Sequence, residues 1–276
     1  MGGYVINRIK NGHVESPKDK DKFGGLFMND TIKLIKHHRS IRKYLAKDVP
    51  AEMLEAILES ARAMPTSING QQLSVVVVKD QEKKAKIAEL TGNQAWIEQA
   101  PVFLVFVADF YKTTIACEKN GMSEIIHESV EGTMVGTFDC GLAMGGAIVA
   151  AESMGLGIVP IGAIRKNPEE MIRLLNLPER TFPVAGLVVG YPADCSARKP
   201  RLPLNIFAHK ETYRAETMKP AIDQYDVLMA DYYSKRDNDG VPKETNWSSQ
   251  VAAAYKQVYF PAVYPAMIKQ GFKNDK

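Results

Sequence analysis

Basic and hydroxyl side chains are concentrated in the stretch HHRSIRKY, which occupies residues 37–44. Its candidates for binding an anion are His38, Arg39, Ser40 and Arg42. A guanidinium group is a planar fork that matches a phosphate, and a serine hydroxyl adds a neutral donor. The same basic side chains could instead complement the dipole at the end of a helix. The stretch by itself leaves both interpretations open.

Three further polar clusters are spread along the chain. They are a polar turn at residues 65–72, the sequence PIGAI at 160–164, and a basic pair that flanks Pro200. Taken singly, each has an ordinary structural explanation as a turn or a solvated loop. Together with residues 37–44 they supply donors for a phosphate, a polyol and the edge of a heteroaromatic ring. The candidate residues in these clusters are Thr66, Ser67, Asn69, Gln71, Gly162, Lys199 and Arg201.

Several catalytic motifs are missing from the sequence. Neither a G-x-S-x-G nucleophile elbow nor an H-E-x-x-H zinc motif occurs, and no Walker A loop is present. The dinucleotide fingerprint G-x-G-x-x-G after a strand is also absent, because the nearest glycines lie in a predicted helix. The three cysteines, Cys117, Cys140 and Cys195, are scattered and lack metal-ligand spacing. We therefore expect no metal site and a reducing, cytoplasmic location.

Charge and hydropathy argue against two classes of partner. The chain of 276 residues carries 35 basic and 32 acidic side chains, which gives a net charge of +3. This balance does not favour nucleic acid or a membrane surface, so an anionic ligand should be small. The N-terminus has no apolar signal-peptide region, and no apolar run reaches about 18 residues, the length of a membrane span. We expect a soluble protein.

Hydrophobic periodicity predicts mixed helices and strands. Strands are predicted at residues 73–80, 100–109, 158–164 and 182–192. The β-branched runs in the first, second and fourth are typical of strands with both faces buried. Helices are predicted at 30–38, after Pro50, at 81–92, at 123–154, after Asn167, at 225–236 and at 247–270. The prolines within residues 198–213 predict an extended segment without a helix. This order, without a detachable linker, indicates one α+β domain.

The predicted central helix contains many small residues. Its glycines are Gly132, Gly136, Gly141, Gly145 and Gly146. Since a glycine inside a helix costs roughly 1 kcal/mol relative to alanine, so many of them indicate that another backbone approaches closely. The approaching element could be the domain's own sheet or a second subunit.

The N-terminal segment differs from the rest of the chain. Residues 1–27 are polar, rich in Lys, Asp and Gly, and weakly periodic. We interpret them as an N-terminal extension or a cloning remnant and exclude them from the fold. The domain then spans residues 28–276, with a C-terminal excursion from about residue 202.

The order of these motifs resembles the nitroreductase superfamily, in particular its NADPH-preferring nitro/flavin reductase branch. The resemblance covers about residues 30–270 and rests on HRSIRKY, PTSINGQQ, LGIVPIGAIRKNPEEMIRLLNLP, VAGLVVGYP and KPRLP. It implies a central mixed sheet flanked by helices. It also implies an intertwined homodimer in which FMN lies between the subunits and a C-terminal arm embraces the partner. Under this resemblance the small residues of the central helix would face the second subunit.

The resemblance gives each polar cluster a role toward FMN. The residues implied for the phosphate are His38, Ser40, Lys199 and Arg201, with Arg39 beside them. Arg42 would lie near N1 and O2 of the flavin, where a cation stabilises the negative charge of the reduced ring. The ribityl chain and ring edge would be contacted by Ser67 and Gln71, and Asn69 would also bind the cofactor. The backbone groups that would face N5 are those of Ile161, Gly162 and Ala163. The branch usually has an aromatic residue and a second glycine where this chain has Pro160 and Ala163.

The implied activity is that of an FMN-dependent NAD(P)H oxidoreductase. Hydride would pass in a ping-pong reaction through flavin N5 to a small acceptor such as a nitroaromatic, a quinone or a flavin, and no obligatory catalytic side chain is assigned. NADPH would be bound by Arg236 and Lys243, with NADH as a second candidate donor. The alternative is a non-catalytic FMN-binding carrier or sensor protein, which would lack a path for the nicotinamide.

Overall fold

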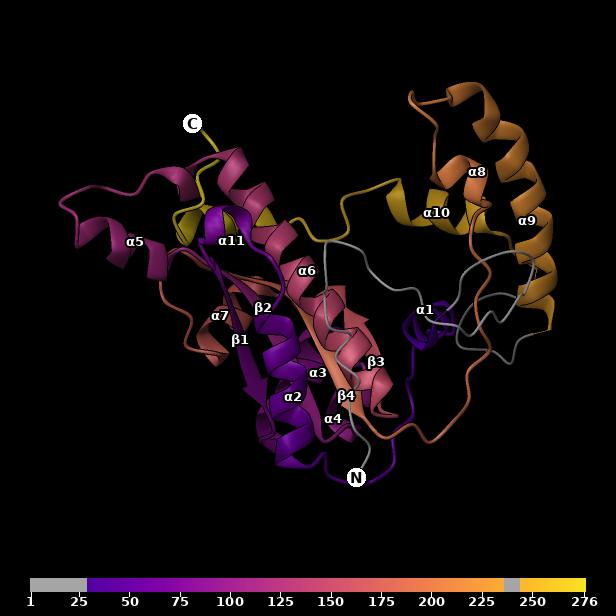
Figure 1. Cartoon of the computed structure of the whole chain (residues 1–276), viewed down its shortest axis with the longest axis horizontal. Coiled ribbons are helices and arrows are strands. Elements are labelled where there is room, and N and C mark those ends of the chain that lie inside the picture. The colour runs from indigo at the N-terminus through magenta and orange to yellow at the C-terminus, as the bar shows by residue number, and fades with distance from the viewer. Residues whose placement is uncertain (1–28, 236–243) are drawn as a thin grey trace, which may run out of the picture.

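Four strands form an open sheet in the order β1-β2-β4-β3. The structure is a computed structural model that describes residues 29–235 and 244–276, so the N-terminal segment 1–27 lies outside the described residues (Figure 1). The strands are β1 (Leu73–Val78), β2 (Val102–Asp109), β3 (Gly157–Ile161) and β4 (Thr181–Gly190). All four predicted strands are confirmed, with ends that shift by up to three residues.

The sheet is less mixed than the resemblance implied. The pairs β1–β2, β2–β4 and β3–β4 are all antiparallel. The parallel contact in the described part of the chain is an isolated bridge between Ser40 and Ile158 at the outer side of β3. The α+β class is confirmed, and the parallel character resides in this short bridge.

The first strand is not buried on both faces as its composition suggested. Every residue of β2 is buried, whereas most of β1 is half-buried and Val77 is exposed. The reason is position, since β1 lies at the edge of the sheet and β2 lies in the middle. A run of valines does not distinguish these two places, because edge and central strands share the same β propensity.

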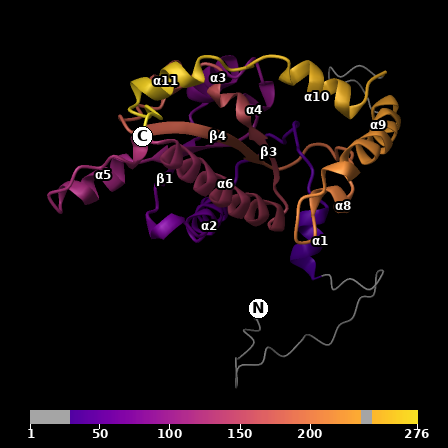
Figure 2. The same ribbon diagram turned by 90° about the horizontal axis from the view of Figure 1, so that it is seen from above.

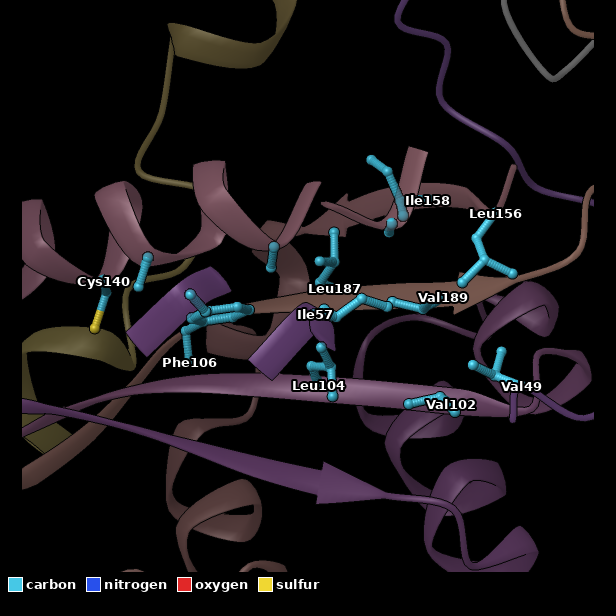
Figure 3. Packing of buried hydrophobic residues seen from close by; sticks show 14 of the residues in the cluster. Val49, Ile57, Val102, Leu104, Phe106, Cys140, Leu156, Ile158, Leu187 and Val189 are labelled. Carbon is cyan, nitrogen blue, oxygen red and sulfur yellow. The ribbon is translucent and has the colours of Figure 1, made fainter. Parts of the chain in front are cut away.

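Helices cover both faces of the sheet. On one face lie α2 (Ala51–Arg62) and α6 (Val130–Ser153), and on the other lie α3 (Gln81–Leu90), α4 (Ala95–Gln99) and α7 (Pro168–Leu174) (Figure 2). The first face carries a core in which Ile57 of α2 lies with Leu104 and Leu187 of the sheet (Figure 3). Successive strand residues alternate between the two cores, as the pleat requires.

The central helix α6 is more apolar than the sequence analysis expected of any segment. By length and composition Val130–Ser153 could cross a membrane, although no sufficient apolar run was expected. In the fold, Ala143, Ala147 and Ala151 are fully buried against the sheet. These contacts place α6 in a core layer of the domain.

The glycines of α6 fall on two faces of the helix. A Cβ at Gly146 would lie 2.8 Å from the backbone oxygen of Ser60 on α2, and one at Gly136 would lie 3.0 Å from the ring of Phe110. A Cβ at Gly141 or Gly145 would meet nothing within 4 Å. Packing within the chain therefore explains the first pair of glycines but leaves the second pair unexplained.

The C-terminal region is an arm that returns to the body. Helices α8 (Leu204–Phe207), α9 (Met218–Ser234) and α10 (Trp247–Tyr255) lie to one side of the sheet, at the right of Figure 1. The prolines at 198–213 did not exclude a helix, because α8 starts directly after Pro203, where a missing N–H costs little. The single helix predicted at 247–270 is wrong as well, since α10 and α11 (Val263–Lys269) are separate.

Helix α11 is fixed to the body by hydrogen bonds at its C-terminal end. The side-chain amide of Gln270 donates to the backbone oxygens of Pro178 and Thr181, both at 2.9 Å. The backbone N–H of Arg180 donates to the backbone oxygen of Gln270 at 2.8 Å. The chain thus crosses from the arm back to the start of β4. Two short helices complete the fold, α1 (Asp30–Lys36) and α5 (Tyr111–Glu118).

Candidate functional site

The stretch 37–44 begins at His37, the C-cap of helix α1, and then leaves the helix to pair with β3. Helix α1 ends at Lys36, two residues earlier than predicted. The chain then runs along β3, where the N–H of Ile41 donates to the backbone oxygen of Ile158 at 2.9 Å. Beyond it, Ala193 N–H donates to the oxygen of Lys43, also at 2.9 Å. This backbone pairing fixes the direction in which each side chain of the stretch points.

Ile41 anchors the stretch to the sheet. Its side chain is 6% exposed and lies against Gly157, where an added Cβ would come within 2.7 Å of Ile41 Cγ1. Because successive side chains of extended backbone alternate, burial of Ile41 turns its neighbours Ser40 and Arg42 the other way. The pattern of one apolar residue between polar ones therefore has a packing reason.

The structure brings the first and last predicted clusters together in one cavity. This cationic cavity has a volume of about 160 Å³. It lies where the stretch 37–44 meets the segment that leaves β4. Its lining residues are His38, Arg39, Ser40, Arg42, Ser196, Ala197, Lys199, Arg201 and Tyr232. Six of these are predicted site residues. They come from two segments that are separated in sequence by more than 150 positions.

The chemistry of the cationic cavity suits a phosphate group. Four of its side chains are Arg or Lys, and among the described residues no acidic side chain lines it. Arg42 also lies over the ring of Trp96, with its guanidinium carbon 5.8 Å from the ring centroid. Arg39 contacts the Sγ of Cys195 through its guanidinium group. Cationic forks and hydroxyl donors of this kind are the usual ligands of phosphate oxygens.

One acidic side chain lies behind the cavity. Glu152 Oε1, in the last turn of α6, is 2.6 Å from Nδ1 of His38. The Glu152 side chain is 11% exposed and that of His38 is 26% exposed, so the pair is largely removed from water. The contact ties the stretch 37–44 to the central helix.

The second predicted cluster lies elsewhere along α6. Ser67, Asn69 and Gln71 are exposed in a loop whose first part is a 3-10 helix, Ser67–Asn69. The φ angles of Ile68, Asn69 and Gln71 are 49°, 56° and 51°. Left-handed conformations of residues other than glycine are uncommon, and they are rarer still for a β-branched residue. The loop is therefore strained.

A buried carboxylate holds this strained loop. Asp139 of α6 is 1% exposed. Its Oδ2 accepts a hydrogen bond from the backbone N–H of Ser67 at 3.1 Å and another from the side-chain amide of Gln72 at 2.6 Å. The two hydrogen bonds fix both ends of the loop. A strained conformation can persist where the surrounding structure holds it in this way.

A second cavity opens beside the loop. This α6 cavity has a volume of about 620 Å³ and is lined mainly by apolar side chains. Ser67 and Asp139 line it together with Met134 and Phe138 of α6. Neither Asn69 nor Gln71 lines the cationic cavity or the α6 cavity.

The third predicted cluster lies at the end of β3. Ile161 is buried, Gly162 is exposed and Ala163 is half-buried at the start of a 3-10 helix, Gly162–Arg165. The structure does not bring these residues into the cationic cavity. Burial lowers the pKa of Arg165, whose guanidinium donates to the backbone oxygen of Val184. The remaining predicted residues, Arg236 and Lys243, lie outside the described residues.

Sequence reasoning missed several residues of the two cavities. Ser196, Ala197 and Tyr232 line the cationic cavity without belonging to any cluster. Glu152 and Asp139 also contact the predicted clusters, and their places in the sequence carried a signal. An acid in the last turn of a helix opposes the dipole, and an acid inside an apolar helix must find donors. Both positions thus indicated a partner from another segment.

The fold and the two cavities fit one class of protein, and the chain belongs to the nitroreductase family. The model of the Nitroreductase family matches residues 35–191. The model of the Nitroreductase family, C-terminal domain, matches residues 199–275. The two matches meet at the segment that carries Lys199 and Arg201.

Individual relatives are similar over nearly their whole length. The FMN reductase [NAD(P)H] of Bacillus subtilis (strain 168) is 48% identical over 90% of this chain and 100% of its own. The NADPH-flavin oxidoreductase of Vibrio harveyi is 34% identical over 88% of this chain and 98% of its own. The solved structure of NfrA2 from B. megaterium is 49% identical, covers 90% of this chain and 100% of its own, and superimposes with a TM-score of 0.87.

Proposed function

We propose that this protein is an FMN-dependent NAD(P)H oxidoreductase. The observation that carries the proposal is the cationic cavity, in which two distant basic segments meet. The family and the printed activities of the B. subtilis and V. harveyi relatives support it. The sequence expectation of an FMN-dependent reductase agrees with these activities.

We assign the cavity to the phosphate of FMN. His38, Lys199 and Arg201 would bind its oxygens together with the hydroxyl of Ser40. Arg39 would add positive charge beside them. Arg42 would stabilise negative charge on the flavin ring. The bound flavin supplies the chemistry, because its ring accepts two electrons from a nicotinamide and passes them to an acceptor. The protein's own residues bind the flavin and orient it.

A second subunit would complete the site. A volume of about 160 Å³ is smaller than the roughly 300–1,000 Å³ of a typical ligand pocket. Within one chain the clusters at Ser67 and Gly162 do not line this cavity. The exposed apolar side chains of α6, such as Met134 and Phe138, fit a surface that a partner covers. We therefore propose a homodimer with the flavin between subunits.

The electron donor and acceptor belong to the same proposal. NADPH is the donor that Arg236 and Lys243 would favour, with NADH as an alternative. The acceptor is a small molecule such as a nitroaromatic, a quinone or a free flavin. The composition fits a soluble enzyme of the cytoplasm.

An absorbance spectrum of the purified protein tests the proposal directly. We expect a yellow protein, or a colourless one that becomes yellow with FMN, and bleaching by NADPH or NADH without oxygen. A protein that retains no FMN would contradict the proposal. Binding of FMN without turnover of NADPH and a quinone would identify a carrier instead.

A further inference from the structure

Arg42 lies between the cationic cavity and the short helix α4. Its side chain lines the cavity, and its guanidinium carbon lies 5.8 Å from the centroid of the Trp96 ring. A cation within about 6 Å of the face of an indole is attracted by the electron-rich ring. Trp96 thus contacts a residue of the cavity, although Trp96 does not line the cavity itself.

Among the described residues, no carboxylate competes with this ring for Arg42. In that part of the chain the guanidinium of Arg42 forms no ion pair and donates no hydrogen bond. Tyr44 lies close enough to interact with its charge, but burial raises the pKa of the Tyr44 hydroxyl, so this group stays neutral. The same hydroxyl donates to the backbone oxygen of Ile41 at 2.8 Å. The contact that holds the guanidinium is therefore the face of Trp96.

Trp96 has a fixed position because α4 is anchored on the core between the sheet and helices α3, α4 and α7. Ile97 of α4 and Ala100 at its C-cap are fully buried. The amine of Lys84 on α3 donates to the backbone oxygen of Ala100 at 2.5 Å. The indole packs against the same core, and its buried N–H has no acceptor within the described residues. Packing, and not a hydrogen bond, determines where the ring lies.

We propose that Trp96 is a positioning residue that holds Arg42 for the ring of the bound flavin. An aromatic face holds a guanidinium without cancelling its charge, whereas a carboxylate would neutralise it. Arg42 then keeps its full charge for the negative charge that the flavin ring gains on reduction. Trp96 acts on the flavin through Arg42. The inference rests on the proposed binding of FMN with Arg42 near the flavin ring.

Loss of the Trp96 ring should weaken the binding of reduced FMN more than that of oxidised FMN. In Trp96→Leu the guanidinium of Arg42 has no ring to lie against, so it occupies more conformations and attracts the reduced flavin less. We expect reduced FMN to bind about three- to tenfold more weakly relative to oxidised FMN, which corresponds to a fall in the two-electron midpoint potential of about 15–30 mV. Anaerobic titration against a reference dye measures this potential.

A double-mutant cycle tests whether Trp96 acts through Arg42. With each variant saturated with FMN, Arg42→Ala should lower the potential at least as much as Trp96→Leu. The double variant should fall no further than Arg42→Ala alone, because the ring then has nothing to position.

Two further variants serve as comparisons. Trp96→Phe keeps a smaller aromatic face and breaks no hydrogen bond of the described residues, so it should fold and should lower the potential less than Trp96→Leu. Trp247→Phe is the matched control, because it removes the indole of α10, which packs edge-on against Tyr225. It should keep the potential of the wild type.

The contact can also be measured without flavin. In flavin-free protein labelled at arginine, NMR should show a guanidinium signal that is absent from Arg42→Ala and is shifted by the ring current of the indole. Trp96→Leu should move this signal toward that of a solvated arginine. Trp247→Phe should leave it in place.

The outcomes separate this inference from the proposed function. A Trp96→Leu protein with the wild-type potential, or a double variant whose fall equals the sum of the two single falls, would overturn the inference and leave the proposed function standing. An Arg42 signal that does not respond to Trp96→Leu would overturn it as well. A chain that retains no FMN would overturn the proposed function and, with it, the role of Trp96 toward the flavin.

Discussion

Single side chains in the cationic cavity would contact the phosphate that we propose binds there. His38, Arg42 and Arg201 reach the cavity from two segments that are otherwise unrelated in sequence. A hydrogen bond to a charged group contributes about 1.5–3 kcal/mol, and several of them around one phosphate can hold it firmly. The strength of the site therefore depends on bringing these donors to one point.

Replacement of Arg201 by alanine tests how much one of these donors contributes to FMN binding. Arg201→Ala should weaken FMN binding by roughly 10- to 100-fold, which corresponds to one lost charge-assisted bond. Quenching of flavin fluorescence on titration measures the dissociation constant. The control is Arg62→Ala, on the exposed surface of α2, where the arginine pairs with Glu59 and lies far from the cavity in sequence. Equal affinities for all three proteins would remove Arg201 from the site.

At the scale of elements, Asp139 joins the central helix to a strained loop. Its carboxylate accepts from Ser67 and Gln72, and the loop between them contains three non-glycine residues with positive φ. Each such residue costs on the order of 1–3 kcal/mol, and its conformation persists only where the surrounding structure holds it. The helix thus determines the shape of a loop that lies about 70 residues earlier in the chain.

The substitution Asp139→Ala should destabilise the fold by about 1–3 kcal/mol, because it leaves the buried side-chain amide of Gln72 and the backbone N–H of Ser67 without their acceptor. Urea denaturation followed by circular dichroism measures the free energy of unfolding. Asp139→Asn serves as the comparison, since its carbonyl oxygen can still accept from the backbone of Ser67. A loss as large for asparagine as for alanine would show that the charge, and not the acceptor, holds the loop.

Two glycines of α6 differ in whether an atom of the same chain lies close to them. Gly146→Ala would place a Cβ 2.8 Å from the oxygen of Ser60, so α2 and α6 would have to move apart and the midpoint of urea unfolding should fall. Gly141→Ala meets no atom of the same chain within 4 Å, so it should leave the packing of α2 against α6 intact. If both variants lost stability equally, the assignment of two different faces would be wrong.

On the scale of the whole molecule, the residues proposed to bind FMN lie at separate places that one chain does not bring together. The cationic cavity lies near the C-terminal end of α6, and the loop at Ser67 lies beside its middle. The face of α6 beside that loop exposes large apolar side chains, with Phe138 66% exposed and Met134 61% exposed. A second copy of the chain against this face would cover apolar surface and add the missing parts of the site.

A charge on this face should separate the proposed dimer. Phe138→Asp is expected to shift the protein from dimer to monomer in analytical ultracentrifugation and to weaken FMN binding at the same time. Leu45→Asp is the control, since Leu45 is also exposed, at 48%, but lies on another segment. A Phe138→Asp protein that remains dimeric with normal FMN affinity would contradict the proposed interface.

Much of the fold followed from local patterns. The four strands and the long central helix were predicted because apolar periodicity and β-branched runs act over a few residues. The edge position of β1 and the short helix α8 were not, because the first depends on distant neighbours and the second on where a proline falls in the helix.

By itself, the sequence indicated which side chains could bind an anion. The residue types in HRSIR and KPRLP, and their order, were enough to indicate an anion and to resemble one family. Only the tertiary structure decided that His38, Arg42 and Arg201 share one cavity, and that Glu152 and Asp139 hold their partners. The reason is physical. The chemistry of a side chain depends on its residue type alone, whereas the contacts between distant segments depend on how the sheet and α6 pack.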